Sequence, residues 1–172
     1  VTAVNVAVDV APLLGISGRA PMRFFRPAMC GALGAAAGIA RLNGADAAMG
    51  HRTLAITSCQ LPGTMQAHVE GSPALALQVA LASRAAVTSW ELARRGFPPP
   101  MDVLEGRFGY LPLYEGEYDP APALAALAAR EPQLLQVSHK VFPTGGAAHA
   151  GQDMLMELRD REGLRMDDIE SI

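Results

Sequence analysis

The chain has 172 residues, of which half are hydrophobic, 18% are charged and 5% are aromatic. Its net charge of −3 provides no basic field for a phosphate backbone, so we do not expect nucleic acid as a partner. The longest apolar run, residues 29–40, is too short to span a bilayer, and the first residues lack the pattern of a signal peptide. We therefore expect a cytoplasmic protein without membrane contact. Its 31 alanines favour closely packed helices.

The first predicted helix covers residues 26–42. Pro27 suits the first turn of this helix, and Asn43-Gly44 suits its end. Small residues recur on one side of the helix at spacings of three and four. They are Gly31, Gly34, Ala35 and Gly38. This stripe predicts a second helix at very close approach.

Three more helices are predicted before residue 132. Residues 46–59 and 73–95 have helical periodicity, and the Pro-rich run at 96–100 stops the second of them. After a connection at 101–118, whose three tyrosines we expect to pack as a loop, Asp119 and Pro120 open an alanine-rich helix that ends near residue 130.

The pattern changes near residue 132. Residues 133–142 alternate in part and predict a strand; the turn at 143–146 leads into an amphipathic helix over 149–162, and 169–172 predict a second strand. The fold class is thus mainly α, with a boundary that separates residues 1–132 from residues 133–172. The first residues begin inside an apolar pattern and the last strand lacks a partner, so we expect a piece of a longer protein, inactive by itself.

The turn around Gly145 and Gly146 is a candidate anion site. A glycine pair allows close backbone approach, and the N-terminus of the next helix directs N–H groups at whatever sits in the turn. Lys140, the only lysine, could reach the same anion. His149 and Asp153 lie on one helix face, where they could act in proton transfer, bind a metal or form a local surface pair. No third ligand is near, so no metal is predicted.

Two further side chains are candidate binding residues. Arg26 precedes Pro27 at a helix start and suits bidentate carboxylate binding, although an ordinary surface arginine is the simpler interpretation. Gln78, like His68, flanks the start of the long helix and could line a pocket or lie on the surface. Cys30 and Cys59 are expected to be free, buried thiols, because two cysteines make no disulfide framework.

Four segments in order resemble the MmgE/PrpD family, which includes 2-methylcitrate dehydratase, cis-aconitate decarboxylase and iminodisuccinate epimerase. They are GALGAAAGIARLNG, LARRGFPPPMDVLEGRFGY, VSHKVFPTGGAAHAGQD and DIESI. The resemblance implies part of a large all-helical domain followed by the start of a smaller α/β lid. It also implies a homodimer, no cofactor, and small polycarboxylates held between the domains.

The resemblance also assigns roles to residues. Lys140 matches the lysine of a K-x-[YF]-P motif in the lid, and His149 matches the histidine after it, which makes both candidate catalytic residues. Arg26, Leu75 and Gln78 stand where many members have histidine, lysine and histidine. With Gly145 and Gly146, Arg26 and Gln78 are the candidate substrate-binding residues. The implied activity is a dehydratase-type lyase for a hydroxy-polycarboxylate. An epimerase or isomerase of a small dicarboxylate, or a non-catalytic carboxylate-binding paralogue, are the alternatives.

Overall fold

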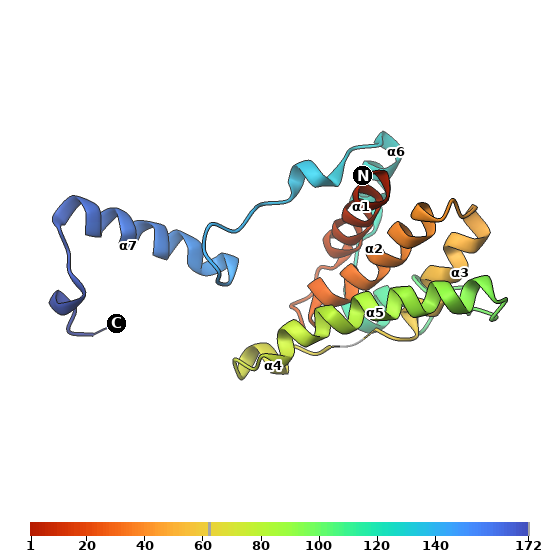
Figure 1. Ribbon diagram of the computed structural model, residues 1–172, viewed down its shortest axis with the longest axis horizontal. Coiled ribbons are helices and arrows are strands. Elements are labelled where there is room, and N and C mark those ends of the chain that lie inside the picture. The colour runs from red at the N-terminus through yellow and green to blue at the C-terminus, as the bar shows by residue number, and fades with distance from the viewer. Residues whose placement is uncertain (62, 172) are drawn as a thin grey trace. The chain divides into compact units, whose positions relative to one another are not determined.

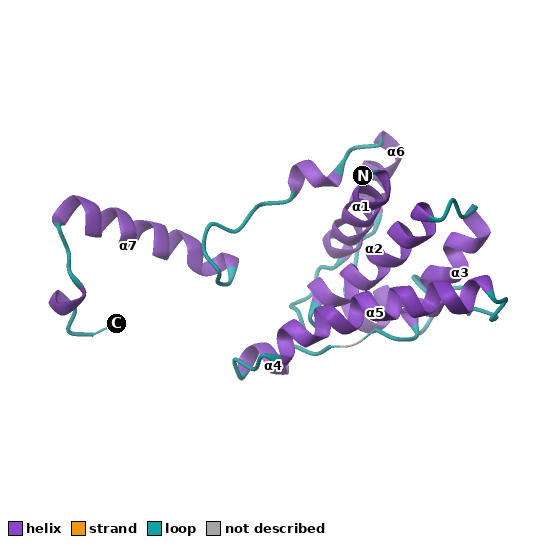
Figure 2. Ribbon diagram, viewed as in Figure 1, coloured by secondary structure: helices purple, strands orange, loops and turns teal. Residues whose placement is uncertain are grey.

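A computed structural model of the chain describes residues 1–61 and 63–171 (Figure 1). Helices dominate these residues, and no extended strand occurs among them (Figure 2). The mainly α fold class is therefore confirmed. The chain divides into two compact units, Val1–Gln136 and Val137–Ile172. The domain boundary expected at residue 132 stays a prediction.

The first unit contains most of the helices. They are α1 (Thr2–Ser17), α2 (Arg26–Leu42), α3 (Ala47–Ser58), α4 (Gln66–Val69), α5 (Ala74–Arg94), the π-helical turn η1 (Leu111–Glu115), α6 (Ala121–Ala129) and the 3-10 turn η2 (Gln133–Gln136). Helix α2 has the predicted bounds, with a proline in its first turn. Asp46 caps α3 by accepting a hydrogen bond from the Met49 amide at 2.8 Å. Helix α1 was not predicted, because its first turn has no cap and Pro12 interrupts its pattern.

Helix α2 is the centre of this unit and packs against α1, α3 and α5 (Figure 1). The predicted close approach is made by α1. A Cβ atom at Gly34 would lie 2.5 Å from the carbonyl oxygen of Ala7, and one at Gly38 would lie 2.8 Å from that of Ala3. The core is accordingly built mainly from small side chains, and among the described residues Tyr110, Met29 and Leu33 are the largest of the almost fully buried side chains.

The segment between α1 and α2 is tied to two distant parts of the chain. Gly18 forms an isolated β-bridge with Tyr118, and Phe24 forms another with Thr64. The Arg19 amide donates to the carbonyl of residue 117 at 2.9 Å. These contacts place the start of α2 beside η1, and this placement determines the surroundings of Arg26.

Both predicted strands are wrong. Residues 133–136 form the 3-10 turn η2, and the chain up to residue 142 has no regular structure; residues 169–171 are also irregular, and Ile172 lies outside the described residues. A strand needs a neighbour to pair its backbone groups. No described segment provides one, so the partly alternating pattern is not realised as a strand.

The second unit contains η3 (Gly146–Ala148), α7 (His149–Glu162) and η4 (Met166–Asp168). Helix α7 has the predicted bounds and ends at Gly163 in the left-handed conformation. Its apolar residues Met154, Leu155 and Leu158 are exposed. In neither unit is a described helix long and apolar enough to cross a membrane.

Candidate functional site

Lys140 contacts the turn that precedes α7. The Lys140 ammonium donates to the carbonyl oxygen of Thr144 at 2.9 Å, and the Thr144 hydroxyl donates to Gln152 Oε1 at 2.7 Å. Gly145 and Gly146 are exposed between these contacts, and the 3-10 turn η3 leads directly into α7. An exposed ammonium, two residues without side chains and a helix start therefore share one short segment. This arrangement suits an anion.

His149 is the first residue of α7 and lies beside the same turn. Its ring meets the ring of Phe142 edge to face, with centroids 5.6 Å apart. Its Nε2 atom is buried and has no hydrogen-bond partner in the described parts of the chain. A buried nitrogen without a partner costs free energy, so Nε2 gains from any donor or acceptor that enters the turn. Asp153 lies one helical turn later and is exposed.

Arg26 binds a carboxylate, and the carboxylate belongs to the chain itself. Its Nε donates to both oxygens of Glu115, at 2.8 and 3.1 Å, and its Nη2 donates to the carbonyl oxygen of Ala20 at 2.9 Å. The Glu115 side chain is 2% exposed and that of Arg26 is 22% exposed. Hydrogen bonding to Glu115 raises the pKa of Arg26, while burial opposes this increase. The guanidinium is therefore neutralised, and its Nη1 donates to no described residue.

The hydroxyl of Tyr110 completes this buried cluster. It donates to Glu115 Oε1 at 2.9 Å and lies 3.1 Å from the sulfur of Cys30. Burial raises the pKa of Tyr110 far above its ordinary value, and the neighbouring Cys30 and Glu115 add to the effect. Burial also raises the pKa of Cys30. Both groups stay protonated at neutral pH, so the cluster holds one positive and one negative charge.

Gln78 lies in α5 and contacts the loop between α3 and α4. Its Nε2 donates to the carbonyl oxygen of Thr64 at 3.2 Å, while its Oε1 is buried without a described partner. A Cβ atom at Gly63 would collide with this amide, and Gly63 has a φ of +108°. Gln78 thus braces the loop between α3 and α4 at Gly63 and Thr64, where this loop contacts the segment before α2. His68 lies in α4.

The predicted site residues fall into two groups. Lys140, His149, Gly145 and Gly146 lie together in the second unit. Arg26 and Gln78 lie in the first unit. Their assignment to substrate binding or catalysis stays a prediction.

Sequence reasoning missed Glu115 and Tyr110. Glu115 is 89 positions from Arg26, and nothing in the spacing links the two. Cys30 is buried as expected, whereas Cys59 is exposed, contrary to expectation. Within the described residues, no three His, Cys, Asp or Glu side chains are grouped closely enough to hold a metal ion.

Comparison with known proteins connects the helical unit to a family. No curated protein that was compared matches the chain. Residues 1–123, however, match the MmgE/PrpD N-terminal domain, and this match covers most of the first unit and well over half of the chain. This match shows that the chain belongs to the MmgE/PrpD family.

Proposed function

We propose that the protein is a lyase of the dehydratase type that acts on a small hydroxy-polycarboxylate similar to 2-methylcitrate, without a cofactor. The observation that carries this proposal is the family match over residues 1–123, because the family includes dehydratases and related enzymes. In this proposal the protein works in the cytoplasm as a homodimer.

The turn before α7 supports the proposal because it contains chemical groups that an elimination reaction needs. Loss of water from a hydroxy acid requires cations that hold carboxylates, a base for the proton beside a carboxylate, and an acid for the departing hydroxyl. Lys140 and the backbone at Gly145 and Gly146 would hold one carboxylate of the substrate. His149 would carry a proton at Nε2, its buried atom without a described partner.

Arg26 has a narrower role in this proposal. Because Glu115 already neutralises the guanidinium, a substrate carboxylate gains less from Arg26 than from a free arginine. The N–H groups on Nη1 still offer directed hydrogen bonds. We propose that Arg26 orients the substrate and that Lys140 supplies the charge.

Replacement of Lys140 tests the proposed function. In the whole protein that carries this chain, Lys140→Ala should lower kcat/KM for a hydroxy-polycarboxylate at least about tenfold, since a charge-assisted contact contributes roughly 1.5–3 kcal/mol. Lys140→Arg should retain more activity than Lys140→Ala. Arg161→Ala, which removes an exposed charge from α7, is the control and should leave kcat/KM unchanged. Equal activity of all three variants would contradict the role of Lys140.

The reaction product separates elimination from epimerisation. In deuterated water, carbon-13 NMR should show the two alkene carbons of an unsaturated product and loss of the signal of the hydroxyl-bearing carbon. Exchange of the α-proton with inversion, and no unsaturated product, would instead identify an isomerase. The same abstraction of an α-proton begins both reactions, so Lys140 and His149 keep their proposed roles in either case.

Two features favour a second candidate, a non-catalytic protein that binds a carboxylate metabolite. Arg26 is already paired with Glu115, and an apolar residue, Leu75, stands where many family members have a lysine. Calorimetry across a panel of di- and tricarboxylates tests this candidate. Binding without turnover in the whole protein would support it, and turnover of any bound compound would exclude it.

A further inference from the structure

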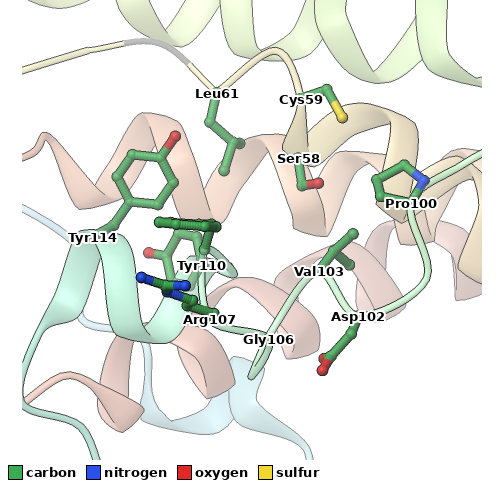
Figure 3. Close-up of a pocket in the computed structure, with 11 residues that line it drawn as sticks. Ser58, Cys59, Leu61, Pro100, Asp102, Val103, Gly106, Arg107, Tyr110 and Tyr114 are labelled. Atoms are coloured by element: carbon green, nitrogen blue, oxygen red, sulfur yellow. The ribbon is translucent and has the colours of Figure 1, made fainter.

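A cavity of about 510 Å³ opens in the first unit between the end of α3, residues 100–108 and η1 (Figure 3). Its volume lies within the range of roughly 300–1,000 Å³ that is typical of small-molecule sites. None of the residues that we assign to polycarboxylate binding lines it. The lining residues are Ser58, Cys59, Leu61, Pro100, Asp102, Val103, Gly106, Arg107, Phe108, Tyr110 and Tyr114.

The walls of this cavity are mainly apolar and are held in place. Figure 3 shows the Leu61 side chain pointing toward the rings of Tyr110 and Tyr114. The hydroxyl of Tyr110 is engaged by Glu115 and Cys30, so this residue offers the cavity its ring. The Tyr114 ring meets Phe24 edge to face at 4.8 Å between centroids. A ligand here would contact a preformed apolar surface.

One cation at the cavity is free to meet a ligand. Arg107 is exposed, its guanidinium lies 5.0 Å from the centroid of the Phe108 ring, and it forms no ion pair with a described carboxylate. Asp102 also lines the cavity, but its carboxylate is turned toward Gly106. A Cβ atom added to Gly106 would lie 3.2 Å from Oδ2 of Asp102. Figure 3 shows this carboxylate pointing away from Ser58 and Leu61. The cavity therefore combines mainly apolar walls with two charged lining residues: Arg107, which has no described ion-pair partner, and Asp102, whose carboxylate is turned toward Gly106.

We propose that this cavity binds a small monoanion with an apolar body, of the aryl- or alkyl-carboxylate class. Arg107 pairs with the carboxylate, and the body of the ligand lies against Leu61, Val103 and the ring of Tyr110. A polycarboxylate fits poorly, because its further charges would lose water against apolar walls, and the described lining contains no second cation. A neutral ligand of the same shape would leave Arg107 without its partner.

Cys59 provides a direct reporter of occupancy. It lines the cavity and is exposed, whereas Cys30 is buried, so a neutral thiol reagent such as iodoacetamide should modify Cys59 in the folded protein. The modification rate of Cys59 is measured in the whole protein by peptide mass spectrometry. The probes are 4-phenylbutyrate, its neutral amide, and the tricarboxylate tricarballylate. We expect 4-phenylbutyrate to slow the modification in proportion to occupancy, its amide to need about tenfold higher concentration, and tricarballylate to have no effect.

Two charge-removing variants make this test specific. Arg107→Gln should weaken protection by 4-phenylbutyrate about tenfold, to the level of the amide. Arg41→Gln removes another exposed arginine, at the end of α2 and outside the cavity, and should leave protection unchanged. Absence of protection by 4-phenylbutyrate, equal protection by acid and amide, or stronger protection by tricarballylate would each overturn the proposal. A Cys59 thiol that reacts only after unfolding would mean that the cavity is covered, and it would overturn the proposal too.

Discussion

The ion pair between Arg26 and Glu115 joins the start of α2 to the end of η1. Glu115 accepts hydrogen bonds from Arg26 and Tyr110. Gly18 packs against the ion pair so closely that a Cβ atom at this position would collide with both partners. Such a buried carboxylate is stable only while its donors are present. The same pairing that limits the charge Arg26 can offer a substrate also holds two distant segments together.

Removal of one partner of this pair should destabilise the first unit. Glu115→Gln leaves the Arg26 charge poorly compensated, and we expect the free energy of unfolding to fall by about 3 kcal/mol, the lower end of the range for broken buried pairs, because part of Arg26 is exposed. Urea denaturation followed by circular dichroism measures the change. Glu91→Gln breaks the exposed pair with Arg94 and is the matched control, with a much smaller effect. Equal effects of the two substitutions would contradict a structural role for the buried pair.

Ionisation of Tyr110 should make the free energy of unfolding fall as the pH rises in the alkaline range. Its folded pKa is raised above the unfolded value of about 10, so its contribution is fully present below pH 10 and is lost as the pH rises further. Urea denaturation between pH 9 and 11 should show a steeper loss of stability for the wild type than for Tyr110→Phe. Tyr118→Phe, which retains Tyr110 and Cys30, should follow the wild type. Parallel curves for the wild type and Tyr110→Phe would contradict the raised pKa.

At the scale of elements, the contact of α1 with α2 depends on glycine at two positions. Gly34 and Gly38 face the backbone of α1, while an added Cβ at Gly31 would meet nothing within 4 Å. The stripe of small residues therefore contains two positions that require glycine and one that does not. The difference cannot be read from the spacing, because it depends on where α1 crosses.

Alanine substitutions separate these positions. Gly34→Ala places a methyl group against the backbone of Ala7 and should lower the free energy of unfolding by about 1–3 kcal/mol, as overpacking does. Gly31→Ala adds the same methyl group to the same helix without a clash. It should leave stability unchanged or raise it by up to about 1 kcal/mol, through the higher helix propensity of alanine. Thermal denaturation of both variants measures the difference, and destabilisation by Gly31→Ala of equal size would contradict the packing.

Helices α2, α3, α5, α6 and α7 could be predicted from the sequence because their signals are local, whereas α1 and α4, which have no side-chain cap, were missed. Pro27 and Asn43 bracket α2, Asp46 caps α3, and Gly163 ends α7. The strands could not, because a strand depends on a neighbour that the local pattern does not contain. The same limit applies to the site: the turn at Lys140 was predictable within one segment, whereas the partnership of Arg26 with Glu115 depends on the tertiary fold.

At the scale of the whole molecule, the two units differ in burial. Helix α2 contributes nine buried residues to the first unit. Between residues 137 and 171, no side chain with a described exposure is buried. A 14-residue helix is marginally stable in water without tertiary contacts. The units should therefore differ in stability when the 172-residue chain is studied by itself.

Hydrogen exchange tests this difference. In the 172-residue chain, amides of α7 should exchange within about tenfold of the unprotected rate, and amides of α2 should exchange slower by orders of magnitude. Mass spectrometry after pulse labelling measures both in one sample, so that α2 is an internal control for α7. Equal protection of α2 and α7 would contradict the inference from burial.

The bridge between Gly18 and Tyr118 bears on the order in which the first unit folds. Contacts of α1 with α2 join residues that are near in sequence, but this bridge closes a loop of about 100 residues, and the entropic cost of closure rises with loop length. The helix pair can thus form early, while the segment that carries Glu115 docks late. We therefore expect the charged cluster around Arg26 to assemble in the last steps of folding, after the scaffold that buries it already exists.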